Sequence, residues 1–135
     1  MTSSKSIAVM VVFGVGLTFA SVGWAAPARD ACAALGDART ALKLMIIAKD
    51  KSVQEALDAK VQAASNRLDS ALAHMTGTQA RVAADFRAVW DQFKETREKK
   101  IIPAIRKGDI EEAKRIADGI QYVRLSKMWS IMSCK

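Results

Sequence analysis

Two cysteines, Cys32 and Cys134, lie near opposite ends of the chain that remains once an apolar N-terminal segment is set aside. Thiols oxidise to disulfides in exported proteins and stay reduced in the cytosol. A Cys32–Cys134 bridge would enclose about 100 residues, and closing a loop of that length stabilises a fold by at most about 4.7 kcal/mol. The first prediction is therefore a disulfide that joins the two ends of the folded chain.

A second group of residues carries soft ligand atoms that could hold a metal. His74 is the only histidine, Met75 follows it, and Met128 and Met132 come shortly before Cys134. Imidazole and thioether groups suit copper(I), and the same groups serve as axial ligands of haem. The Cys-x-x-Cys-His motif of covalently attached haem is absent. We expect no cofactor, because Met side chains also fill helical cores, and copper or haem b is the alternative.

Basic side chains offer a third kind of chemistry. Arg39 and Lys43 lie one helical turn apart, and Arg124 is expected to approach them where the first and last helices meet. Neighbouring cations attract a carboxylate or a phosphate, and arginine can hold either one with two hydrogen bonds. If a small ligand binds, we therefore expect an anion held by Arg39, Lys43 and Arg124. The alternative is a solvated rim of charge.

The other polar residues argue against catalysis and against nucleic acid. His74 has no Asp or Glu at helical spacing, and the chain has no nucleophile elbow and no Gly-rich phosphate loop. The formal net charge is +7 over 135 residues, but the basic residues form no patch interleaved with aromatic residues. We therefore expect a protein that is not an enzyme and that does not bind nucleic acid.

Four helices are predicted to position these residues. Apolar residues recur every three to four positions through residues 30–49, 53–75, 79–107 and 110–133, whereas period-two alternation is absent. The connections are short, and short connections make consecutive helices antiparallel neighbours. The predicted fold is all-α: an antiparallel up-down-up-down four-helix bundle formed by residues 26–135 as one domain.

Capping residues mark the predicted joints between these helices. Two pairs have capping-box spacing, Ser52 with Glu55 and Thr76 with Gln79. At the last joint, Gly108 is expected to adopt the left-handed conformation that ends a helix, and Asp109 to cap the next one, with Glu112 at its third position. Pro103 lacks an amide proton, so it predicts a kink or break within residues 99–103.

Residues 1–25 are typical of a signal peptide. Lys5 precedes an uncharged apolar run at residues 7–20, and small residues follow, with cleavage expected after Ala25. The alternative is an uncleaved membrane anchor, because a run of about 20 residues is long enough to cross a bilayer. Cleavage predicts a periplasmic or secreted protein, and contact with a membrane is expected only if the segment is retained.

Residues 90–125 carry a pattern that resembles a known family. The stretches are Trp-Asp-Gln-Phe-Lys-Glu-Thr-Arg at residues 90–97 and Ile-Pro-Ala-Ile-Arg-Lys-Gly-Asp-Ile-Glu-Glu-Ala at residues 102–113. They resemble helices 3 and 4 of the four-helix-bundle sensor domains of methyl-accepting chemotaxis receptors. The resemblance implies a periplasmic bundle, often dimeric, that binds small ligands or partner proteins. No second membrane helix follows, so a signalling role would need a partner protein, and no binding residue is carried over from the family.

These features predict an exported, non-enzymatic, sensor-like helical bundle. Its expected partner is a small, anionic molecule or a protein of the periplasm, and a homodimer is compatible with the resemblance. The alternative function is electron transfer by a small haem- or copper-binding bundle of the cytochrome b/c′ architecture.

Overall fold

The computed structural model describes residues 25–135. The predicted signal peptide, or membrane anchor, therefore lies outside the described residues except for Ala25. The elements are α1 (Ala25–Ile47), α2 (Lys51–Ala73), η1 (Gly77–Gln79), α3 (Ala80–Thr96), η2 (Arg97–Ile101), α4 (Ile102–Arg106), α5 (Ile110–Asp118) and α6 (Ile120–Met132). Residues 25–135 contain no strand, so the all-α prediction is confirmed for this range. Among these helices, none is both long and apolar enough to cross a membrane.

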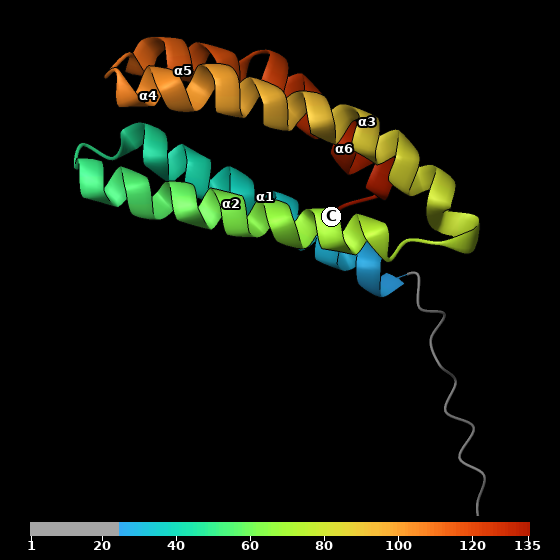
Figure 1. The fold of residues 1–135 in the computed structure, drawn as a ribbon. Helices are drawn as coiled ribbons and strands as arrows, with labels where there is room; N and C mark the ends of the chain where they lie inside the picture. The colour runs from blue at the N-terminus through green and yellow to red at the C-terminus, as the bar shows by residue number, and fades with distance from the viewer. Residues whose placement is uncertain (1–24) are drawn as a thin grey trace, which may run out of the picture.

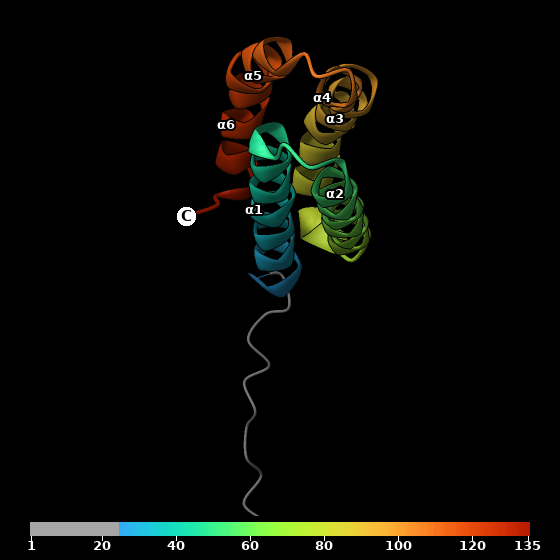
Figure 2. The ribbon, with the colours of Figure 1, turned by 90° about the vertical axis from the view of Figure 1, so that its left-hand side faces the viewer.

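The helices form two hairpins. In the first hairpin, α2 returns alongside α1 after a short turn (Figure 1). In the second, α3, η2 and α4 follow one another as one long rod, and α5 with α6 return along it. The view along the helices shows that the first hairpin lies against the second (Figure 2). Residues 48–50 and 107–109, which close the two hairpins, lie at the same end of the molecule.

Two apolar clusters fill the interior between the hairpins. One lies at the end with the disulfide, and it includes Leu35, Leu68, Phe86, Trp90 and Met128. The other lies toward the closing turns, and it includes Leu42, Met45, Val61, Ile101, Ile105 and Ile116. Burial of this apolar surface is the main force that holds the two hairpins together.

A polar layer separates the two clusters. Ser65, Arg97 and Gln121 are buried, and each lies in the chain between a residue of one cluster and a residue of the other. Gln121 donates to the carbonyl oxygen of Phe93 at 2.8 Å. Arg97 contacts Glu98 through Nε and Nη2 at 3.0 Å each, while its buried Nη1 has no partner. Burial lowers the pKa of Arg97, because the charged form is separated from water.

The predicted capping boxes of the second and third helices are wrong. Helix α2 begins at Lys51, two residues earlier than expected, and Asp50 is its cap. The Asp50 carboxylate accepts hydrogen bonds from both the amide and the hydroxyl of Ser52, at 2.7 Å each. Thr76 precedes η1 without a side-chain capping bond. Asp50, two residues earlier, therefore replaces the Ser52 cap, because either residue type can satisfy the first free amides of a helix.

The predicted joint at Gly108 and Asp109 is confirmed. Gly108 has a φ of 78°, which glycine adopts without steric cost, and the amide of Asp109 bonds the carbonyl oxygen of Ala104 at 2.9 Å. The Asp109 carboxylate then accepts from the amide of Glu112 at 3.3 Å and caps α5. The Glu112 carboxylate bonds Arg115 and does not reach back to the cap.

The break predicted near Pro103 is present as a π-helix. In η2 the amide of Ile102 bonds the carbonyl oxygen of Arg97, five residues back. A regular α-helix would press the Pro103 ring against a carbonyl oxygen of the preceding turn and would leave that oxygen without a donor. The wider turn accommodates the ring while the rod continues into α4.

The prediction of one continuous fourth helix over residues 110–133 is wrong. It is broken between α5 and α6 at Gly119, whose φ and ψ are −92° and −110°. A Cβ atom at this position would lie 2.8 Å from the carbonyl oxygen of Arg115, closer than van der Waals contact allows. Glycine therefore permits the chain to change direction between the two helices.

We expect Gly119→Ala to lower the free energy of unfolding by about 1–3 kcal/mol, because the added methyl group must displace backbone. Gly36→Ala is the matched control. Gly36 lies inside α1 with no atom within 4 Å of an added Cβ, so the change should stabilise the protein by up to about 1 kcal/mol through helix propensity. Urea denaturation measures both, and equal midpoints for the two variants would contradict the close contact at Gly119.

Candidate functional site

The predicted disulfide is present. Cys32 of α1 and Cys134, just after α6, are bonded, with their Cα atoms 5.6 Å apart. Ser133 has a φ of 53°, and the amide of Cys134 bonds the carbonyl oxygen of Trp129 at 2.9 Å. This helix-ending turn places Cys134 beside α1. The disulfide therefore ties the last helix to the first at the end where the larger apolar cluster lies.

The predicted metal ligands lie in different environments. His74 is exposed, and its Nδ1 lies 2.7 Å from the carbonyl oxygen of Ser70. Met75, Met128 and Met132 are buried in the apolar cluster at the disulfide end. Across the described residues, no three His, Cys, Asp or Glu side chains gather where they could hold a metal. The structure thus places the imidazole toward solvent and the thioethers in the core.

The three cations predicted to bind an anion do not share one cavity. Arg39 stacks over the ring of Trp129, with its Cζ 5.4 Å from the ring centroid. Arg39 and Lys43 line a hollow of only about 40 Å³, close to the volume of one water molecule. Arg124 lines a different and larger cavity. The structure therefore does not bring Arg124 together with Arg39 and Lys43, because Arg124 bonds Gln92 and Thr96 of α3.

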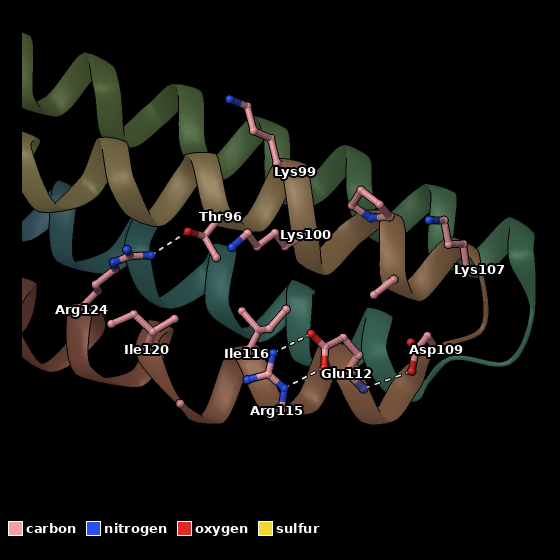
Figure 3. A pocket seen from close by; sticks show the side chains of 13 residues that line it. Thr96, Lys99, Lys100, Lys107, Asp109, Glu112, Arg115, Ile116, Ile120 and Arg124 are labelled. Carbon is pink, nitrogen blue, oxygen red and sulfur yellow. Dashed lines mark hydrogen bonds and ion pairs between the residues drawn. The ribbon is translucent and has the colours of Figure 1, made fainter.

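That larger cavity is a groove of about 620 Å³ in the second hairpin. We call it the basic groove. One wall comes from the end of α3, η2 and α4, and the other from α5 and α6 (Figure 3). Its cationic residues are Lys99, Lys100, Lys107, Arg115 and Arg124, and its acidic residues are Asp109 and Glu112. A volume of this size is typical of small-molecule sites.

Two of the five cations are neutralised by carboxylates. Arg115 donates to both oxygens of Glu112, at 2.7 and 2.6 Å, and this bond lowers the pKa of Glu112 and raises that of Arg115. Lys99 bonds Glu95 at 2.7 Å, which lowers the pKa of Glu95. These pairs are exposed, so water screens them and they contribute little to stability.

The other three cations are available to a ligand. Arg124 donates through one nitrogen to Thr96 Oγ1 at 2.7 Å, to Gln121 Oε1 at 3.0 Å and to the carbonyl oxygen of Gln92 at 3.4 Å. All three acceptors are neutral. Within residues 25–135, neither Lys100 nor Lys107 forms an ion pair with a carboxylate. Lys100 and Arg124 therefore have no bonded carboxylate in the basic groove, and Glu112 and Glu95 act on them only at longer range.

Two irregularities in the helices shape this groove. The π-helix carries Lys99 and Lys100, which lie about one turn before Pro103, and the break at Gly119 separates Ile116 from Ile120. All of these residues line the cavity. Of all the residues that line the basic groove, only Arg124 is among the site residues predicted from the sequence. The dipeptide at residues 118–119, Asp-Gly, is a common helix-ending signal and could have indicated the break. The position of Lys100 relative to Arg124 depends on packing between the two walls.

Comparison with known proteins gives no relative. No protein-family model matches the chain, and searches of the curated proteins and of the solved structures find no match either. The resemblance to chemoreceptor sensor domains therefore stays a prediction, and the function has to be inferred from the groove.

Proposed function

We propose that this protein is an exported, non-enzymatic binding module whose basic groove holds a small anionic ligand. In this proposal the two hairpins make up an antiparallel up-down-up-down four-helix bundle, and residues 1–25 are a signal peptide. The disulfide supports export, since such bonds persist in the periplasm and outside the cell. The resemblance to periplasmic sensor domains supports a binding role, with a partner protein relaying any signal.

The observation that carries the proposal is the unpaired charge of Arg124 and Lys100 in a cavity of ligand size. Arg124 is only partly exposed and is held by Thr96 and Gln121, so its guanidinium is positioned before a ligand arrives. Figure 3 shows that Lys100 extends from the opposite wall toward Thr96 and Arg124. Two cations that converge without a carboxylate attract an anion, and a hydrogen bond between charged groups is worth about 1.5–3 kcal/mol.

As a test ligand we choose 3-phenylpropionate, a small carboxylate. We expect Arg124→Ala to weaken its binding by about ten-fold or more, since one charge-assisted hydrogen bond is lost. Isothermal titration calorimetry with the disulfide-bonded protein measures this change. Arg39→Ala is the control, because it removes the same charge from a residue outside the groove. The neutral amide, 3-phenylpropionamide, should bind far more weakly than the acid.

Three outcomes would contradict the proposal. Binding of the acid that is unchanged in Arg124→Ala would remove the basic groove as its site. A loss of binding in Arg39→Ala alone would transfer the site to the hollow beside Trp129. Equal binding of the acid and the amide would remove the role of charge.

A further inference from the structure

The charge of the basic groove is concentrated at one end. At the end near Thr96, neither Arg124 nor Lys100 bonds a carboxylate within the described residues, and Glu95 and Glu112 act on them only at longer range. Toward the turn at Gly108, Arg115 and Lys107 share the groove with Glu112 and Asp109, so two cations face two carboxylates. A second negative group on a ligand would meet those carboxylates. The groove therefore favours a single anionic group at the Arg124 end.

Apolar side chains line the groove beside this charge. Pro103 and Ala104 lie on one wall, and Ile116 and Ile120 lie on the other. Figure 3 shows both isoleucines between Arg124 and the Glu112–Arg115 pair. Ile120 is 49% exposed, and Gly119 next to it contributes no side chain that would cover it. An inorganic anion would leave this apolar surface in contact with water, whereas a ligand with a hydrocarbon portion would cover it.

We propose that the ligand is an amphiphilic monoanion: a small carboxylic acid with an aromatic or aliphatic body. Its carboxylate lies between Arg124 and Lys100, and its apolar part lies against Ile120, since Ile116 is only 6% exposed. This inference rests on the proposed function and adds the chemical class of the ligand to it.

Calorimetric titration of the disulfide-bonded protein with 3-phenylpropionate, acetate and inorganic phosphate tests the ligand class. We expect 3-phenylpropionate to bind at least about ten-fold more tightly than acetate or phosphate, because only it has an apolar part that buries the exposed surface of Ile120. Ile120→Ser should weaken its binding by about ten-fold and leave acetate unaffected. Val123→Ser is the matched control: Val123 is also exposed on α6, at 61%, but does not line the groove, so its replacement should change nothing.

The outcomes separate the ligand class from the proposed function. If acetate or phosphate binds as tightly as 3-phenylpropionate, and Arg124→Ala weakens both, the groove is a simple anion site and the amphiphilic class is wrong. Equal effects of Ile120→Ser and Val123→Ser would also overturn the class. If none of the three anions binds, both the class and the proposed function fail.

Discussion

Replacement of both Cys32 and Cys134 by serine should lower the free energy of unfolding by as much as about 4.7 kcal/mol. The two residues are 102 positions apart, so in the unfolded state the bond restricts nearly all of the chain that folds. Such a loss is a large part of the 5–15 kcal/mol, roughly, that stabilises a typical domain. Urea denaturation followed by circular dichroism measures it. At 25 °C the helical signal should stay close to that of the parent, because the apolar clusters and the caps are unchanged.

Reduced parent protein is the control for this change. It should unfold at the same urea concentration as the double variant, because both lack only the covalent bond. A variant as stable as the oxidised parent would show that the bond does not restrict the unfolded chain. Two thiols that react with an alkylating reagent in denatured, unreduced protein would rule out the disulfide itself.

Trp90→Ala should destabilise the protein by about 3–5 kcal/mol, the range for removal of a large aromatic side chain from a core. Trp90 is fully buried and stacks on Phe93, with ring centroids 5.8 Å apart. Its indole nitrogen donates to Asp69 at 2.8 Å, and Lys94 and Arg97 lie near its ring. The substitution therefore leaves a cavity and a buried Arg97 without its aromatic neighbour, and Asp69 Oδ1 keeps only its hydrogen bond from Lys94.

Two other variants distinguish packing from hydrogen bonding at this position. Trp90→Phe keeps an aromatic ring but loses the donor to Asp69, so most of the stability should remain. Trp129→Ala removes an indole that is only partly buried, and it should cost less than Trp90→Ala. Thermal denaturation ranks the three variants. An equal loss in Trp129→Ala and Trp90→Ala would show that burial of Trp90 is not what stabilises the core.

The helices and the disulfide could be predicted because each depends on local signals. Apolar residues at three- and four-residue spacing define the buried faces, and Gly108 with Asp109 ends one helix and starts the next. The Cys32–Cys134 bond follows from two cysteines at the ends of an antiparallel arrangement. Short connections fix which helices are neighbours, and so they bring the two ends of the chain together.

The site was harder to predict because it depends on how helices are rotated against each other. Arg39 and Arg124 both lie next to apolar residues in the sequence, but the rotation of α6 directs Arg124 toward Thr96 and leaves Arg39 on Trp129. A shift of one residue along a helix turns a side chain by about 100°, so periodicity alone cannot assign its partner. The break at Gly119 adds to this, because it interrupts the helix five residues before Arg124.

An NMR titration tests most directly whether the basic groove is the binding site. Amide ¹H–¹⁵N signals of the disulfide-bonded protein would be followed as 3-phenylpropionate is added. We predict that the largest shifts occur at residues that line the groove, above all Thr96, Lys100, Gly119, Ile120 and Arg124. Shifts centred on Arg39 and Lys43, or no concentration-dependent shift at all, would contradict the assignment of the groove as an anion-binding site.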